Sequence, residues 1–157
     1  MPSSEKSKTK VLIFDWDVHH GDGTQDIFYN TNETLFVSTH QFENATFYPL
    51  GGTGHHEKIG EGEGKGFNIN VDWNLGNRNK LVCNDYFYIF KKVLFPIIQN
   101  FSPEMIIVSA GFDSCRGDKL GHCHLSPRLY YNVTQEFKKV QKKIVVSLEG
   151  GYTIENV

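Results

Sequence analysis

This chain of 157 residues lacks the features that mark several classes of protein. It has three cysteines, Cys83, Cys115 and Cys123, an odd number without Cys-x-x-Cys spacing. These cysteines fit free thiols in a reducing compartment better than they fit a disulfide framework. No apolar run approaches the ~20 residues that a membrane-spanning helix needs. The polar residues 1–10 contain no apolar segment of the kind found in signal peptides, and we expect them to form a flexible tail or loop.

An excess of charge of one sign is also missing. Sixteen Lys and Arg are balanced by 18 Asp and Glu, which leaves a formal net charge of −2. Domains that bind nucleic acid through its phosphates are normally basic, so we expect no direct contact with nucleic acid. The glycine-rich segment 60–66 lacks the Gly-Lys-Ser/Thr order of a phosphate-binding loop. The sequence therefore predicts a protein of the nucleus, the cytoplasm or both, with no membrane contact.

The chain does contain enough apolar residues (39%) to build the core of one domain or of part of a larger one. Short apolar runs alternate with segments of helical spacing, and a long segment rich in Gly, His and Glu covers 41–66. This alternation predicts an α/β fold with a parallel sheet covered on both faces. We expect strands at 11–16, 34–39, 67–73, 105–110 and 143–148. We expect helices at 23–29, from about Asn79 to Asn100 and at 126–142, and the start of another at 153–157. Pro96 should strain or end the helix in which it lies.

The most informative segment is residues 15–23, Asp-Trp-Asp-Val-His-His-Gly-Asp-Gly, directly after the first apolar run. In an extended chain, alternate side chains share a face, so Asp15, Asp17 and His19 are expected to point the same way. Like charges buried side by side are costly unless a cation or hydrogen bonds compensate them. A divalent metal held by Asp17 and His19 would be such a compensation.

Polar residues also follow the other expected strands, where parallel sheets bind their ligands. Asp113 follows the strand at 105–110, and Tyr152 follows the strand at 143–148. Asp17, His19 and Asp113 would supply the three ligands of a catalytic metal site; this set suits zinc, while Fe(II), Co(II) and Mn(II) stay open. The Tyr152 hydroxyl would either stabilise an oxyanion or belong to a packed turn residue.

Three motifs bring a resemblance to a known family: residues 15–25, Ser-Ala-Gly-Phe-Asp at 109–113 and Leu-Glu-Gly-Gly-Tyr at 148–152. Together with Phe-Tyr-Pro at 47–49 and Gly-Phe-Asn-Ile-Asn-Val at 66–71, they resemble the histone deacetylases, in particular class II. The resemblance implies a three-layer arginase/deacetylase-like fold, partial, over residues 11–157. It also implies zinc-dependent hydrolysis of the acetyl amide of acetyl-lysine, on histone tails or other proteins, and a place in a corepressor complex that represses transcription.

The resemblance assigns a role to individual residues as well. Zinc would be held by Asp17, His19 and Asp113, Tyr152 would be the oxyanion donor, and Asp15 and Asp22 would orient a pair of basic imidazoles. A structural K⁺ would be held by backbone carbonyls of Asp15, Asp17 and His19 with Ser38, and a second K⁺ would lie near Phe28, Thr31 and Thr34. The wall of the acyl-lysine tunnel would include Phe47, Tyr48, Gly150 and Gly151.

The chain departs from the family at its general base, which is a tandem His-His pair upstream of the first motif. Residues 1–10 contain no histidine, and the pair His55-His56 does not match by position. We therefore expect the chain to be the C-terminal half of a catalytic domain, weakly active by itself.

Three other functions stay open or are disfavoured. The chain could deacetylate acetylpolyamines or other small amides, or it could be a non-catalytic scaffold. An arginase-like enzyme is disfavoured, because such enzymes have an Asp-Ala-His-x-Asp motif and this chain has Val18 in place of Ala, followed by His-His-Gly.

Overall fold

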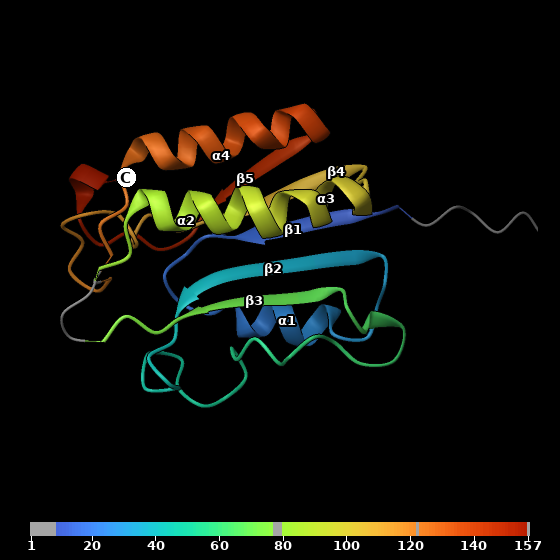
Figure 1. Cartoon of the computed structure of the whole chain (residues 1–157), viewed down its shortest axis with the longest axis horizontal. Helices are drawn as coiled ribbons and strands as arrows, with labels where there is room; N and C mark the ends of the chain where they lie inside the picture. The colour runs from blue at the N-terminus through green and yellow to red at the C-terminus, as the bar shows by residue number, and fades with distance from the viewer. Residues whose placement is uncertain (1–8, 77–79, 122, 157) are drawn as a thin grey trace, which may run out of the picture.

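The computed structural model describes residues 9–76, 80–121 and 123–156. In this part of the chain, strands form one parallel sheet in the order β3-β2-β1-β4-β5 (Figure 1). The strands are β1 (Val11–Asp15), β2 (Thr34–Gln41), β3 (Asn68–Trp73), β4 (Met105–Ala110) and β5 (Ile144–Leu148). Each expected strand is confirmed: β4 has the predicted bounds, and the ends of the others differ from the prediction by at most two residues. From β1 the chain adds β2 and β3 on one side of the sheet, and it then returns to add β4 and β5 on the other side. The loops that follow β1 and β4 are therefore neighbours.

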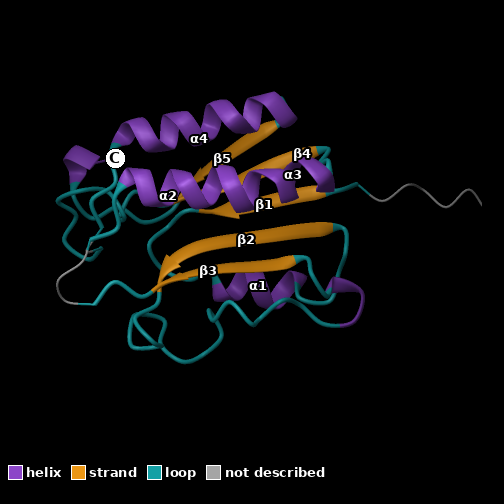
Figure 2. Ribbon diagram, in the orientation of Figure 1, coloured by secondary structure: helices purple, strands orange, loops and turns teal. Residues whose placement is uncertain are grey.

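Helices lie on both faces of the sheet, which confirms the three-layer α/β architecture (Figure 2). The helices α2 (Cys83–Ile89), α3 (Phe95–Phe101) and α4 (Pro127–Val140) cover one face, and α1 (Asp22–Phe28) lies on the other. Phe14 of β1 packs on the first face, with its ring 5.9 Å from that of Phe90 and 5.1 Å from that of Phe137. Phe36 of β2 points to the opposite face of the sheet, where its ring lies beside Gly21 at the start of α1. Alternating side chains thus join both helical layers to one sheet.

The long helical region between β3 and β4 differs from its prediction at Pro96. The expected first residue, Asn79, lies outside the described residues, and the helix begins at Cys83. It continues through a π-helical segment, Phe90–Leu94, into α3, so Pro96 stands in the first turn of α3 and does not end the helix. Proline has no N–H to donate in the helix. The wider π-helical turn at Phe90–Leu94, just before Pro96, allows the helix to continue without that hydrogen bond. The helix ends at Phe101, where Ser102 takes a left-handed conformation (φ 54°).

The two outer strands of the sheet have different surroundings. The long segment after β2 is irregular, as expected, apart from a 3₁₀ turn at Gly62–Gly64, and it runs beside β3. At the other edge, β5 leaves Val145, Val146 and Leu148 between 52% and 60% exposed. The predicted helices on both faces are present, but no helix in the described part of the chain fully covers β5. The expected helix start at 153–157 is a 3₁₀ turn, Ile154–Asn156, and Val157 lies outside the described residues.

None of the helices in the described part of the chain is both long enough and apolar enough to cross a lipid bilayer.

Candidate metal centre

The loops that follow β1, β4 and β5 meet at one edge of the sheet. The Trp16 N–H donates to the Ser109 carbonyl (3.1 Å), and the Phe112 N–H donates to the Gly150 carbonyl (2.9 Å). These bonds hold the segment after β1 against the end of β4, and the segment after β4 against the one after β5. Polar residues more than 90 positions apart in the sequence are thereby brought to one place.

Asp17, His19 and Asp113, the three residues expected to hold a metal, lie together at this edge. The distance from His19 Nδ1 to Asp17 Oδ1 is 2.9 Å, and that from His19 Nδ1 to Asp113 Oδ2 is 3.1 Å. One ligand atom from each residue lies within 4.8 Å of both others. We call Asp17, His19 and Asp113 the central cluster.

Backbone N–H groups fix the two carboxylates of the central cluster. Val18 donates to Asp113 Oδ1 (2.8 Å), and Gly150 donates to Asp17 Oδ2 (2.9 Å). The N–H of His19 donates to Asp17 Oδ1 (2.8 Å), and that of Asp17 donates to Asp15 Oδ1 (2.9 Å). The last two of these bonds form consecutive Asx turns at the end of β1. Asp15, Asp17 and His19 line one cavity, as expected, but the chain is not extended beyond Asp15, where β1 ends; turns rather than strand alternation bring Asp17 and His19 together.

Two glycines make room for the carboxylates. A Cβ atom on Gly111 would collide with the side chain of Asp17, and a Cβ on Gly150 would collide with carboxylate oxygens of both Asp17 and Asp113. Gly151 adopts a φ of 132°, which side-chain-bearing residues rarely take. Glycine at 111 and 150 thus allows the loops after β4 and β5 to close around the acidic groups.

The electrostatics of the central cluster favour a positive charge at its centre. Burial alone would lower the pKa of His19, but the carboxylates of Asp113 and Asp17 outweigh it and raise the pKa to about 9. Burial raises the pKa of Asp113. Burial has the same direction at Asp17, but hydrogen bonds from His19 and Gly150 outweigh it and lower the pKa. In the metal-free protein, the imidazolium of His19 supplies the positive charge that these carboxylates require.

One buried oxygen fits a role as a cation ligand. Asp113 is fully buried, and its Oδ2 accepts no hydrogen bond from any residue that the structure describes, although it lies 3.1 Å from His19 Nδ1. A buried carboxylate oxygen is costly without a donor or a cation beside it. In the metal-free chain the His19 imidazolium, 3.1 Å away, offsets that cost, and a coordinated cation would take over the same role. The donor set of two carboxylates and one imidazole therefore fits a divalent metal ion.

Aromatic residues surround His19 on its open side. The ring of Phe47 stacks on the imidazole, with centroids 5.3 Å apart and an angle of 17° between the planes. Tyr48 and Tyr152 meet the imidazole edge-on, at 5.7 and 6.5 Å. Both tyrosines are substantially exposed. The structure thus brings the expected tunnel residues Phe47 and Tyr48, and the expected oxyanion donor Tyr152, to the same imidazole as the central cluster.

The expected orienting residues, Asp15 and Asp22, have different surroundings. Asp15 is buried, and burial together with the nearby charge of Asp17 raises its pKa well above the usual value. It lines a cavity of about 250 Å³ together with Asp17, His19 and Glu149. Asp22 is exposed in the first turn of α1, where it accepts a hydrogen bond from the Gly23 N–H (2.8 Å). Of the two expected orienting residues, Asp15 lines the cavity beside the central cluster and Asp22 does not.

The residues expected around potassium ions fall in two places. Ser38 is level with Asp15 across β1 and β2, but its hydroxyl bonds with His40 Nδ1 at 2.9 Å. Phe28 ends α1, and its carbonyl accepts the Thr31 N–H (3.2 Å), while Thr34 begins β2. These positions are compatible with two separate groups, and potassium binding stays a prediction.

Sequence reasoning missed a buried polar network that holds the loop 42–66 to the sheet. Gln25 Oε1 accepts hydrogen bonds from Asn68 (2.9 Å) and Asn70 (2.8 Å) and pairs with His20 Nε2 (3.1 Å). His40 Nε2 pairs with the Gly54 carbonyl (2.9 Å), and burial lowers the pKa of His40 to about 4, so this histidine is neutral. The spacing of Asn68 and Asn70 at period two was the signal available, because it places both amides on one face of β3.

The tandem pair His55-His56 lies apart from the central cluster. It stands in the loop 42–66, and both imidazoles face Asp72 of β3, with His56 Nδ1 at 3.0 Å from Asp72 Oδ2 and His55 Nε2 at 4.0 Å. Among the described histidines, only His19 pairs with Asp17 or Asp113. The structure thus gives His55 and His56 no contact with the central cluster.

Fold and site together define a class of protein: a three-layer parallel α/β domain with a cluster of two carboxylates and one imidazole at the carboxyl edge of its sheet. Comparison with known proteins makes this specific. The family model of the histone deacetylase domain matches residues 3–157. Histone deacetylase 15 of Arabidopsis thaliana is 44% identical over 149 residues, covering 94% of this chain and 26% of that protein. Histone deacetylase HDA1 of Candida albicans is 42% identical over 153 residues, covering 97% and 18%. The chain belongs to the histone deacetylase family.

Solved structures agree with this assignment. The chain matches the HD domain of HDA15 with a TM-score of 0.88 and 42% identity, and the match covers 94% of this chain and 41% of that structure's chain. For the histone deacetylase Clr3, the TM-score is 0.90, the identity 41%, and the coverage 94% and 25%. The fold is therefore the arginase/deacetylase α/β fold. The chain spans about a fifth to a quarter of the length of the curated relatives that it matches.

Proposed function

We propose that this chain carries the metal centre of a zinc-dependent deacetylase that hydrolyses the acetyl amide of acetyl-lysine on histone tails or other proteins. The observation that carries the proposal is the convergence of Asp17, His19 and Asp113 beside Tyr152 in a chain of the histone deacetylase family. Acetylated histones would be nuclear substrates, and a corepressor complex would be a partner; cytoplasmic substrates fit the same chemistry.

Asp17 and Asp113 would hold the zinc ion through one oxygen each, and His19 through Nδ1. Three protein ligands leave a position for water or substrate, which is the usual arrangement in catalytic zinc sites. Zinc bound there would supply Lewis acidity, polarising the amide carbonyl and lowering the pKa of water. The backbone donors Val18 and Gly150 fix the opposite carboxylate oxygens and thereby orient the two acidic ligands.

Tyr152 would donate its hydroxyl proton in a hydrogen bond to the oxyanion that develops from the acetyl carbonyl. In the metal-free chain, burial and then the charges of Asp113 and Asp17 raise the pKa of Tyr152 above its ordinary value. A tyrosine hydroxyl is protonated at neutral pH even at that ordinary value, so it can donate. Such a donor contributes about 3–4 kcal/mol to transition-state stabilisation in other enzymes. Phe47 and Tyr48 would flank the aliphatic part of the acyl-lysine, which their rings can bury.

The general base would come from outside the residues described here. Asp15 lines the cavity of about 250 Å³ beside the central cluster, and this cavity would receive an imidazole that Asp15 orients. Asp22 would orient a second one. Without a positioned base, the rate falls by roughly 10²–10⁴. We infer that the chain alone binds metal but turns over slowly.

Potassium would have a structural role in this proposal. Carbonyls of Asp15, Asp17 and His19 with Ser38 would hold one K⁺ near the central cluster, and the group of Phe28, Thr31 and Thr34 would hold another. Oxygen ligands are those that such hard cations prefer.

The test compares acetate release from an acetyl-lysine histone peptide by two zinc-loaded proteins. One is this chain alone, and the other is this chain joined to the part of the solved HDA15 domain that it does not cover. We expect turnover by the joined protein at least ~10² times faster than by the chain alone.

Each other outcome has a definite meaning. Equal, fast turnover by the chain alone would contradict the proposal that its general base is missing. Preference for an acetylated polyamine over the peptide would favour the small-amide alternative. A joined protein that binds zinc but hydrolyses no acetyl amide would contradict an enzyme and favour a scaffold.

A further inference from the structure

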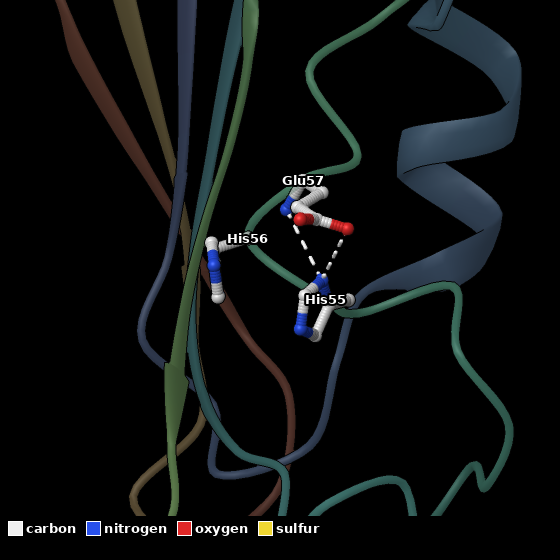
Figure 3. A group of neighbouring side chains, drawn as sticks. All are labelled: His55, His56 and Glu57. Atoms are coloured by element: carbon white, nitrogen blue, oxygen red, sulfur yellow. Dashed lines mark hydrogen bonds and ion pairs between the residues drawn. The ribbon is translucent and has the colours of Figure 1, made fainter.

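Another group of side chains of metal-ligating types lies outside the central cluster, in the loop 42–66. His55, His56 and Glu57 follow one another in the sequence, and one ligand atom from each lies within 4.8 Å of both others. We call these three residues the loop cluster. Figure 3 shows His55 and Glu57 turned toward each other, with His56 beside the strand β3.

A folded turn, rather than chance proximity of surface side chains, sets the geometry of the loop cluster. The Lys58 N–H donates to the His55 carbonyl (2.9 Å), which closes a turn over the cluster. Asn70 of β3 also donates to the His55 carbonyl (3.3 Å), and Asn68 donates to the Lys58 carbonyl (2.6 Å). Both ends of the turn are thus fastened to the sheet. Within it, His55 Nδ1 lies 3.5 Å from Glu57 Oε2.

Asp72 prepares one imidazole for a metal. Its two carboxylate oxygens lie 3.1 and 3.0 Å from His56 Nδ1. If Nδ1 carries the proton and donates it to Asp72, Nε2 of His56 keeps a free electron pair. A carboxylate that accepts the Nδ1 proton of a metal-bound histidine is the usual outer partner in zinc sites, because it fixes the tautomer and the orientation of the ring. The Asp72 side chain is only 10% exposed, so this support is held by the sheet.

We propose that the loop cluster is a second transition-metal site, which binds Zn²⁺ through His55, His56 and Glu57 with water at the remaining position. Two imidazoles and a carboxylate are a preferred donor set for zinc. The His55, His56 and Glu57 side chains are 36%, 61% and 79% exposed, so an ion reaches them directly from solvent. A cavity of about 610 Å³ beside the cluster, lined by His55, Glu57 and Phe42, leaves space for the remaining ligand.

The second ion would fasten the loop that carries the aromatic residues near the central cluster. Phe47 and Tyr48 lie in the same loop as His55, and the ring of Phe42 lies 5.8 Å from that of His55. An ion on His56, which is oriented by Asp72, would connect this loop to β3. The second site would therefore stabilise the loop and would take no part in the reaction at the central cluster.

The test counts Zn²⁺ by equilibrium dialysis and metal analysis in the chain and its variants. We expect two ions per wild-type chain, one in Asp113→Asn, one in the double variant His55→Ala/His56→Ala, and none when all three changes are combined. His124→Ala is the matched control, because His124 is an exposed histidine elsewhere, and it should keep both ions. Glu57→Gln, a milder change, should weaken the second ion at least ~10-fold.

A second measurement follows the loop itself. In the Asp113→Asn background, Zn²⁺ should slow amide hydrogen exchange at residues 50–60, and the two histidine substitutions should remove this effect. Two outcomes would overturn the second site: a wild-type chain that binds one ion and keeps it in the double histidine variant, or a second ion that survives in that variant. Loss of the only ion in the double variant would support the loop cluster while contradicting the central one.

Discussion

The central cluster and the loop cluster hold similar donor atoms in opposite ways. Asp17, His19 and Asp113 come from two segments far apart in the sequence, and Asp113 is fully buried. His55, His56 and Glu57 are consecutive, and Glu57 is 79% exposed. At the central cluster, both carboxylates receive backbone hydrogen bonds. At the loop cluster, Asp72 pairs with His56 Nδ1, and the Glu57 N–H donates to His55 Nδ1 (3.4 Å).

The difference bears on how each site is coupled to folding. The ligands of the central cluster meet only in the folded chain, so metal bound there stabilises the fold by its full binding free energy. The consecutive ligands of the loop cluster stay close together in the unfolded chain, so the unfolded chain keeps part of the affinity for metal. Metal bound at the loop cluster therefore adds less to the free energy of unfolding. A buried site built from distant residues is suited to chemistry, and an exposed local site is suited to holding a loop.

The largest effect is expected from Asp113→Asn. Asparagine keeps the shape of the side chain and can still accept the Val18 N–H, but it removes a charged ligand from a fully buried position. We expect zinc at the central cluster to be lost, a larger change than the ~10–100-fold caused by loss of an outer partner. Isothermal titration with Zn²⁺ measures it. Asp26→Asn, an exposed aspartate on α1, is the control and should bind as wild type.

Tyr152→Phe should separate catalysis from metal binding. The change removes the hydroxyl alone, so turnover of an acetyl-lysine peptide by the joined protein should fall about 10²–10³-fold in kcat. Zinc affinity should stay unchanged, because Tyr152 is not a ligand. Tyr131→Phe, on the exposed face of α4, should have no effect. Equal kcat values for Tyr152→Phe and wild type would refute the oxyanion role.

Thermal unfolding tests the coupling of each cluster to folding. At a zinc concentration 100 times the dissociation constant, an ion at the central cluster should add about 2.7 kcal/mol to the free energy of unfolding. We expect this rise in the His55→Ala/His56→Ala variant and a clearly smaller one in Asp113→Asn. The reverse order would contradict the comparison of the two clusters.

The pH dependence of the metal-free chain reports on His19. Its pKa is about 9 in the folded state, against about 6.5 when unfolded, so the folded chain binds the extra proton between these values. The resulting stability is present below pH 6.5 and is lost as the pH rises through 9. With allowance for solvent screening, the loss is about 2 kcal/mol. Urea unfolding at pH 6 and pH 9.5 measures it, and His19→Asn should flatten the difference.

The smallest effect is expected from Gly150→Ala. The added Cβ would push against the carboxylates of Asp17 and Asp113 and displace them slightly, so zinc affinity should fall about tenfold, in the range of altered outer-shell support. Gly52→Ala is the matched control, because a Cβ there meets nothing within 4 Å. Identical zinc affinities for the two alanine variants would show that Gly150 is not needed for the site.

Much of the fold was predictable because apolar runs and helical spacing are local signals. The strands β1 and β4 follow from unbroken apolar runs, and the polar residues after them indicated the site at their carboxyl ends. The π-helical segment before Pro96 was not predictable, because it arises from how a continuous helix accommodates a missing N–H.

The residues of the central cluster were predictable from the sequence, but the geometry that brings them together was not. The sequence indicated Asp17, His19 and Asp113, yet the argument from strand alternation did not apply, since β1 ends at Asp15 and side-chain turns arrange the rest. Gln25 carried no signal by itself, because its partners Asn68 and Asn70 are more than 40 positions away in the sequence. The exposure of Val145 and Val146 depends on what packs against β5, which local sequence does not encode.

The central claim is that Asp17, His19 and Asp113 together bind zinc. Anomalous X-ray diffraction at the zinc edge, on crystals of the zinc-loaded chain, tests it most directly. We predict a strong peak within ligand distance of Asp17, His19 and Asp113, which disappears in Asp113→Asn crystals. A zinc-loaded chain with no peak at these residues, or with one that persists in Asp113→Asn, would contradict the account.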